Sequence, residues 1–250
     1  MPASATFKSP VFRRNMLFEQ VAEEVTRRIR DGLWKVGDML PSDAELAADF
    51  QVSQGTVRRA LKELTDKGIL VRLQGRGTFV ASYKDRAGDV QNRYVRLVPD
   101  AGESSLPTKT EQPVFEETVP SYEIARILKL PLGEPVIHIL RFHYAETGPV
   151  SVDEFYLRRD VFTRLTAQNM LHHDEPLLYA FFQNVCGVTI VRCEETAKAA
   201  MLAPAFCEKF GMSQSIPIIE GRRISYTYDD VPVEYRIQRS ITEHYHLKLS

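Results

Sequence analysis

The chain has 250 residues, of which 44% are hydrophobic and 26% are charged. This composition is typical of a globular protein with enough apolar residues for two domains. No apolar run reaches the roughly 18 residues that a membrane span needs, and the first residues lack the apolar core of a secretory signal, so we expect a cytoplasmic protein without membrane contact. Three cysteines without CxxC spacing indicate reduced thiols. The sequence predicts neither a metal site nor a cofactor.

Charge is unevenly distributed along the chain. Residues 1–86 contain 15 Lys and Arg against 11 Asp and Glu, whereas the remainder contains 17 against 22. The basic part is therefore the one expected to face phosphates if the protein binds nucleic acid. So small an excess of positive charge does not by itself indicate nucleic-acid binding.

The first predicted element is an amphipathic helix from Leu17 to Arg30. Its apolar stripe repeats every four residues, at Leu17, Val21, Val25 and Ile29. Gly32 follows the helix, as glycine commonly does just beyond a helix end.

Two further helices follow, separated by a short turn. Ser42 and Glu45 have the spacing of a capping box, which predicts a helix start at this point. Ser53 is predicted to cap a second helix that runs to Lys67. Its apolar face comprises Val57, Ala60, Leu61 and Leu64. Two short helices across a tight turn are typical of a helix-turn-helix.

A glycine-tipped hairpin completes the predicted N-terminal domain, residues 12–82. Apolar and polar residues alternate over 69–73, residues 74–77 form a turn, and residues 78–80 return. Arg76 lies between two glycines at the tip, where a backbone phosphate can approach closely. A capped helix or a glycine turn alone has many explanations. Helix, capped helix, turn, capped helix and hairpin in this order indicate a winged helix-turn-helix that binds DNA.

These segments resemble the DNA-binding domain of GntR-type regulators over about residues 16–81. The resemblance rests on LPSDAELA at 40–47, VSQGTVRRAL at 52–61 and GRGTFV at 75–80. It implies that the Ser53-capped helix enters the major groove. The predicted DNA-binding residues are Ser42, Ser53, Gln54, Gly55, Thr56, Arg58, Lys62, Arg72, Gly75 and Arg76. Of these, Ser42, Lys62, Arg72 and Arg76 are interpreted as backbone contacts, which position the protein without specifying sequence.

Two positions depart from the commonest pattern of that family. Ala44 and Gln54 stand where many members carry arginine. Arginine suits the N7 and O6 atoms of guanine, whereas glutamine suits the N6 and N7 atoms of adenine. Our hypothesis is that the operator has an adenine under Gln54.

Residues 83–92 are predicted to be a linker, and residues 93–250 an α+β domain with an antiparallel sheet, because β-hairpin patterns there alternate with short helices. The order of elements resembles the UTRA effector domain of the HutC-type branch, whose fold is similar to that of chorismate lyase. The segments that carry the resemblance are ILRFH at 139–143, PVSVDEFYL at 149–157, LLY at 177–179 and VPVEYR at 231–236.

The candidate effector-binding residues were chosen for their chemistry. Arginine holds carboxylate or phosphate with two hydrogen bonds, and glutamate accepts from hydroxyl or amine groups. The set is Arg141, His143, Glu154, Tyr156, Glu234 and Arg236. The alternative is that these residues lie on a solvated face of the sheet. His143 stands where many members have a second arginine, which leaves room for a carboxylate or an aromatic acid rather than a sugar phosphate.

The resemblance implies a homodimeric transcriptional repressor that binds double-stranded operator DNA and responds to a small, often anionic metabolite. Two alternatives remain open. One is an enzyme, although the sequence contains no HExxH, GxSxG or P-loop motif, and a fold analogy does not establish activity. The other is a DNA-binding protein whose second domain only dimerises, which a wholly apolar pocket would favour.

Overall fold

The computed structural model describes residues 13–82, 96–100, 109–172 and 177–248. The chain divides into two compact units, Met1–Asp85 and Arg86–Ser250. The predicted linker, residues 83–92, lies wholly outside the described residues. Within the described ranges, no helix is both long and apolar enough to cross a membrane.

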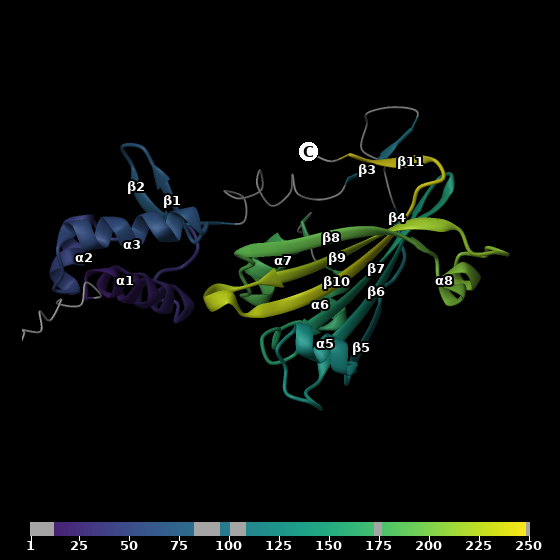
Figure 1. The fold of residues 1–250 in the computed structure, drawn as a ribbon, viewed down its shortest axis with the longest axis horizontal. Coiled ribbons are helices and arrows are strands. Elements are labelled where there is room, and N and C mark those ends of the chain that lie inside the picture. Colours follow the sequence, from purple (N-terminus) through teal and green to yellow (C-terminus); the bar gives the residue numbers. More distant parts are fainter. Residues whose placement is uncertain (1–12, 83–95, 101–108, 173–176, 249–250) are drawn as a thin grey trace, which may run out of the picture. The chain divides into compact units, whose positions relative to one another are not determined.

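The first unit is a three-helix domain with a β-hairpin (Figure 1). Its elements are α1 (Arg13–Arg30), α2 (Asp43–Asp49), α3 (Gln54–Asp66), β1 (Leu70–Leu73) and β2 (Gly77–Val80). Helix α3 packs against both α1 and α2. The hairpin strands are antiparallel, with Leu73 opposite Gly77. This is the winged helix-turn-helix that the sequence predicts.

Local sequence signals account for the start of each short helix. The Ser42 Oγ accepts a hydrogen bond from the Glu45 backbone N–H at 3.3 Å, and the Glu45 carboxylate accepts one from the Ser42 N–H at 2.8 Å. The Ser53 Oγ accepts one from the Thr56 N–H at 3.2 Å. These are the predicted caps, and each satisfies backbone donors that have no partner within the helix.

The predicted apolar stripes of α1 and α3 are correct apart from one residue. All four predicted residues of α3 are buried. In α1, three of the four predicted residues are buried, but Leu17 is 46% exposed and its neighbour Phe18, which is 8% exposed, takes its core position. In the hairpin, Leu70 is buried while Leu73 is exposed, because an alternation over so few residues does not fix which side of the strand faces the core.

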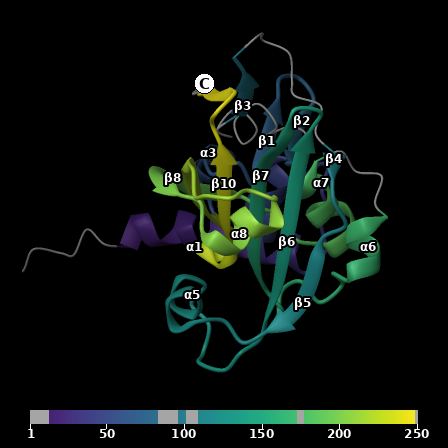
Figure 2. The same cartoon turned by 90° about the vertical axis from the view of Figure 1, so that its right-hand side faces the viewer.

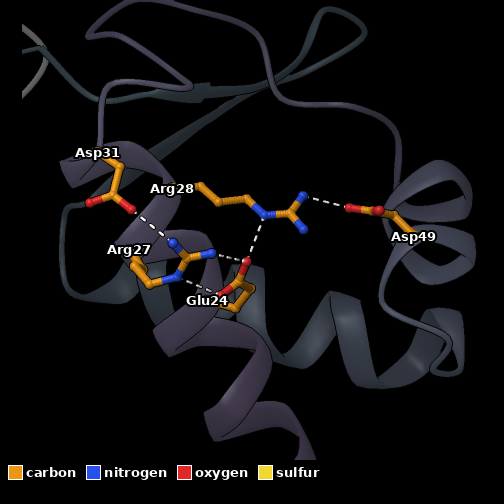
Figure 3. A network of polar contacts seen from close by, with 5 residues as sticks. All are labelled: Glu24, Arg27, Arg28, Asp31 and Asp49. Atoms are coloured by element: carbon orange, nitrogen blue, oxygen red, sulfur yellow. Dashed lines mark hydrogen bonds and ion pairs between the residues drawn. The ribbon is translucent and has the colours of Figure 1, made fainter.

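An ion-pair network joins α1 to α2 (Figure 3). Glu24 accepts hydrogen bonds from both Arg27 and Arg28, and Arg28 also reaches the Asp49 carboxylate. The Arg28 guanidinium lies over the Phe50 ring, 4.6 Å from its centroid. Hydrogen bonds from Arg27 and then Arg28 lower the pKa of Glu24 from its ordinary 4.5 to about 2.

This network predicts a pH-dependent contribution to stability. Because the folded protein holds Glu24 ionised, the unfolded chain takes up the proton first as pH falls. The stabilisation is therefore complete above about pH 4.5 and lost as pH falls towards 2. We expect Glu24→Gln to lower the thermal midpoint near pH 7, and the difference from the parent to shrink below pH 4.5. Glu23→Gln on the same helix is the control, and a difference constant from pH 7 to 3 would contradict the prediction.

In the described part of the second unit, seven strands form one antiparallel sheet in the order β4-β6-β7-β10-β9-β8, with β5 also paired to β6. Figure 2 shows β5, β6, β7 and β10 as neighbouring ribbons. The strands are β4 (Lys109–Thr110), β5 (Val114–Thr118), β6 (Val136–Ala145), β7 (Gly148–Arg158), β8 (Arg192–Met201), β9 (Pro217–Tyr226) and β10 (Pro232–Ile241). A separate antiparallel pair joins β3 (Arg96–Pro99) to β11 (Tyr245–Lys248). The α+β prediction is confirmed.

Short helices cover both faces of this sheet. On one face, α5 (Tyr122–Ile127) packs near Val136 and Tyr235, while α8 (Pro204–Lys209) packs near Ile218 and Ile241. The other face receives α7 (Leu178–Phe181), which continues into a π-helical turn over Phe182–Cys186. Helix α6 (Ala167–Leu171) precedes α7 in the chain. We name the two faces after residues that they carry: the Tyr156 face holds α5 and α8, and the Arg141 face holds α7.

Candidate functional site

The predicted DNA-binding residues gather at the start of α2, along α3 and on the hairpin. All ten are exposed except Thr56, which is half-buried. Ser42 and Ser53 use their hydroxyls as helix caps. Gly75 has a positive φ of 73°, a conformation that favours glycine at the tip of the wing. The adjacent arginines Arg58 and Arg59 differ, because Arg59 lies over the Phe18 ring at 3.9 Å and Arg58 points away from that contact.

Asp43, which the sequence analysis did not select, links the recognition helix to the wing. Its Oδ2 lies 3.0 Å from the Arg58 Nε and 3.7 Å from the Arg72 Nη2. Both arginines remain more than half exposed, so phosphate oxygens can reach them. Lys62 pairs with Asp66 at 2.7 Å, while Arg76 has no ion pair within the described ranges.

The position of Gln54 gives a testable prediction about sequence preference. Gln54 is the first residue of α3 and is exposed. We expect Gln54→Arg to shift the preferred base under this residue from adenine to guanine, with discrimination of about 1–3 kcal/mol. Selection from a randomised operator library measures the shift. Gln74→Arg on the wing adds the same charge and should leave base preference unchanged. An unaltered preference in Gln54→Arg would refute the hypothesis.

On the Arg141 face, strand pairing brings four polar side chains together. Asp153 lies opposite Arg141 in the register of β6 and β7. Its Oδ2 accepts hydrogen bonds from the Arg236 Nη2 at 2.8 Å and from the His143 Nε2 at 3.2 Å. The His143 Nδ1 lies 3.0 Å from the Thr110 Oγ1, so both ring nitrogens have contacts.

This group carries more positive than negative charge in a buried position. Burial alone would raise the pKa of Asp153, but Arg236 and His143 outweigh burial and hold it below its ordinary value. Burial lowers the pKa of Arg141, and the repulsion from Arg236 adds to that effect, whereas Asp153 opposes it. In the described part of the chain, no hydrogen bond or ion pair engages Arg141. Two guanidiniums thus lie near one carboxylate, which forms an ion pair with Arg236 but not with Arg141, and this excess of positive charge attracts an anion.

Glu234 lies farther along the same face and is fully buried. The Tyr179 hydroxyl of α7 donates to its Oε2 at 2.8 Å and lies 2.9 Å from the Ser225 Oγ. Arg223 on β9 pairs with Glu195 on β8 at 2.9 Å. The Glu234 Oε1 has no hydrogen-bond partner among the described residues. These contacts form a second polar group beside α7.

The six predicted effector residues do not lie on one face. Side chains alternate between the two faces along a strand. Asp153 and Phe155 point to the Arg141 face, so Glu154 and Tyr156, each one position further along β7, point to the Tyr156 face. There Glu154 accepts hydrogen bonds from Tyr156, His138 and Arg239. Glu154 and Tyr156 therefore cannot line the same pocket as Arg141, His143, Glu234 and Arg236. The carboxylate that the structure places beside Arg141 is Asp153.

Comparison with known families agrees with this architecture. Residues 17–80 match the family described as bacterial regulatory proteins, gntR family, and residues 104–246 match the UTRA domain. The chain is a GntR-family regulator with a UTRA domain. Its named relatives place it in the HutC-type branch that the sequence resembles.

Three relatives show the extent of this similarity. The histidine utilization repressor of Klebsiella aerogenes is 37% identical over 137 residues, which are 55% of this chain and 56% of that protein. The mannosyl-D-glycerate transport and metabolism repressor of Escherichia coli is 28% identical, covering 93% of this chain and 95% of that one. A crystal structure of the ligand-binding domain of a GntR-family regulator from Bordetella bronchiseptica matches with a TM-score of 0.58 and 31% identity, over 63% of this chain and 97% of that chain.

Three residues at this GntR-family regulator's candidate sites were absent from the predicted site residues: Asp43, Asp153 and Tyr179. Asp153 carried a usable signal, because it shares strand parity with the apolar residues Phe155 and Leu157 that face the core. Tyr179 lies in a segment that resembles the UTRA domain, but no local pattern indicated its contacts with Ser225 and Glu234, which are 46 and 55 positions away in the chain.

Proposed function

We propose that this regulator represses transcription by binding operator DNA as a homodimer, and that a small anionic molecule bound on the Arg141 face weakens that binding. The observation that carries the proposal is the half-buried Arg141 guanidinium, which no anion engages within the described ranges. The relatives named as repressors act in histidine utilization and in mannosyl-D-glycerate transport and metabolism. We therefore assign this chain to the control of genes for the use of a small metabolite.

The proposed DNA contacts divide into two classes. Gln54, Gly55, Thr56 and Arg58 lie in the first turns of α3, the part of a recognition helix that reaches base edges. Ser42, Ser53, Lys62, Arg72, Gly75 and Arg76 surround this helix start and are assigned to the phosphate backbone. Two recognition helices of a dimer would then read half-sites about one helical turn apart.

The proposed effector site consists of Arg141, His143, Asp153 and Arg236, with Glu234 farther along the same face. Arg141 is half-buried and has lost part of its hydration without gaining a partner, and a bound carboxylate or phosphate would compensate for that loss. A domain that only dimerises needs no such convergence of buried charges. We assign no catalytic activity, because the relatives are regulators and the polar groups on this face serve recognition in the proposal.

Regulation follows if the effector binds one arrangement of the dimer better than the other. The effector then shifts the population towards the arrangement with lower affinity for the operator. A coupling free energy of about 1–3 kcal/mol between the two sites is sufficient for a useful switch.

The test combines ligand binding with DNA binding on the full chain. Carboxylates, sugar phosphates, amino acids and aromatic acids are screened by thermal shift, where a ligand at 100 times its Kd adds about 2.7 kcal/mol of stability. Hits are then added to the protein bound to DNA from upstream of its own gene. We expect a hit to release the DNA, and Arg141→Gln to bind DNA but ignore the hit. Hits that leave DNA affinity unchanged would reject the proposed regulation.

A further inference from the structure

One carboxylate oxygen connects the recognition helix α3 with the wing. The Asp43 Oδ2 accepts a hydrogen bond from the Arg58 Nε at 3.0 Å and lies 3.7 Å from the Arg72 Nη2. Arg58 is on α3, 15 positions from Asp43 in the chain, whereas Arg72 is on strand β1 of the wing. Because both guanidiniums contact the same oxygen, they are held side by side although they belong to different elements.

The position of the Asp43 carboxylate is determined by the start of α2. Asp43 is the first residue of this helix and follows Ser42, which forms the capping box with Glu45. A single methylene joins its carboxylate to the backbone, and the side chain is only 17% exposed. The carboxylate is therefore nearly fixed relative to α2, and the longer arginine side chains adapt to it.

The contact leaves the end of the Arg58 guanidinium free. Asp43 engages the Nε, and no other contact holds the Nη1 or Nη2 atoms in the part of the chain that the structure describes. The Arg58 side chain is 63% exposed, so these two nitrogens can reach DNA. Paired N–H donors of an arginine recognise two acceptors on a base edge. Arg58 thus presents its donors to DNA in a direction that the protein sets before binding.

Folding stability does not explain why a carboxylate lies at this position. Arg58 and Arg72 are 63% and 59% exposed, and ion pairs of such exposed groups contribute little to stability. A negative charge close to the DNA-binding surface also repels phosphates. Ordering a flexible side chain on binding costs affinity, and a side chain that is ordered beforehand avoids that cost. Orientation of Arg58 is therefore the benefit that offsets the repulsion.

We propose that Asp43 is a positioning residue for operator recognition, which holds Arg58 by its Nε so that the Nη1 and Nη2 atoms face a base edge, and keeps Arg72 beside it. This inference rests on the proposed binding of operator DNA and adds a residue that determines specificity through Arg58. Loss of the carboxylate should raise the affinity for unrelated DNA, because a negative charge near the phosphates is removed. It should nevertheless lower the ratio of operator affinity to unrelated affinity, because Arg58 loses its orientation.

The test compares two DNA duplexes of equal length and base composition. One is the sequence that the parent protein selects from a randomised library, and the other is a shuffled version of it. Affinities of the full chain are measured by fluorescence anisotropy at one salt concentration. We expect Asp43→Asn to lower the affinity ratio by about 3–10-fold for each copy of the chain that binds. An unchanged or larger ratio would overturn the inference.

Asp43→Asn has nearly the same shape as the parent and is expected to fold, which thermal melting verifies. If it does not fold, Asp43→Ala takes its place, because alanine is the strongest helix former.

A double-mutant cycle shows whether Asp43 acts through Arg58. Arg58→Gln should lower the affinity ratio by itself. Adding Asp43→Asn to Arg58→Gln should then lower the ratio no further, because no arginine remains to be oriented. A general disturbance of α2 would lower the ratio in both backgrounds, and equal losses in both would overturn the inference.

Asp66→Asn is the matched control for the change of charge. Asp66 is also a carboxylate of the DNA-binding unit, and it pairs with another proposed DNA cation, Lys62, at 2.7 Å. Its replacement should raise the affinities for both duplexes by similar factors and leave their ratio unchanged. A loss of ratio as large as that of Asp43→Asn would show a general effect of charge and overturn the inference.

These measurements separate the inference from the proposed function. If the parent prefers its operator and Asp43→Asn keeps the full ratio, operator binding stands and the role of Asp43 fails. If the cycle gives the expected result but no ligand releases the operator, the role of Asp43 stands and the proposed regulation fails.

Discussion

Raising the salt concentration from 50 to 200 mM is expected to weaken operator binding by about 10³–10⁵-fold. The reason is the release of counterions when cations neutralise DNA phosphates. Lys62, Arg72 and Arg76 give three proposed phosphate contacts by cations per copy, all exposed, and six per dimer. With about 0.9 ions released per contact, a plot of log affinity against log salt should have a slope near −5. Fluorescence anisotropy with a labelled operator fragment measures it.

Single substitutions show whether these cations are the ones that neutralise DNA phosphates. Arg76→Ala should reduce the magnitude of the slope by about 1 for each copy of the chain and weaken binding uniformly across sequences. Lys67→Ala is the matched control, because Lys67 lies at the other end of α3 and pairs with Glu63 at 2.7 Å. A flat salt response, or equal slopes for Arg76→Ala and the parent, would contradict the assigned interface.

Replacing Asp153 with alanine is expected to lower the unfolding free energy of the second unit by about 3–5 kcal/mol. The ion pair between Asp153 and Arg236 has side-chain exposures of 5% and 10%. The variant leaves the Arg236 guanidinium buried without its carboxylate, next to Arg141, and that loss of compensation causes the destabilisation. Chemical denaturation followed by a probe specific to the second unit measures the change.

Two companion variants test the physical cause. Asp153→Leu combined with Arg236→Met removes both charges and should recover most of the lost stability, because no buried charge is left unpaired. Asp160→Ala breaks the pair of Arg158 with Asp160, whose carboxylate side chain is 53% exposed, and should cost less than about 1 kcal/mol. If Asp153→Ala lowers the unfolding free energy no more than Asp160→Ala does, the buried pair of Asp153 and Arg236 is not the source of stability that we infer.

The sequence predicted the DNA-binding unit closely because its signals are local. A helix cap depends on residues three positions apart, as in Ser42 with Glu45, and a hairpin depends on the glycines of its own turn. The apolar stripes of α1 and α3 each cover four positions, and of these eight residues only Leu17 is exposed. The alternation in β1 is shorter, and it left Leu73 misplaced.

The proposed effector site depends on the pairing of distant strands, which no local pattern contains. The sequence supplied the residue types, including Arg141, His143 and Arg236, and the order of elements that resembles the UTRA domain. Only the pairing of β6, β7 and β10 placed Asp153 among them and moved Glu154 to the opposite face. A shift of one residue in strand register exchanges the two faces of a sheet. Register is fixed by the packing of the whole domain, so the tertiary structure decided which charges meet.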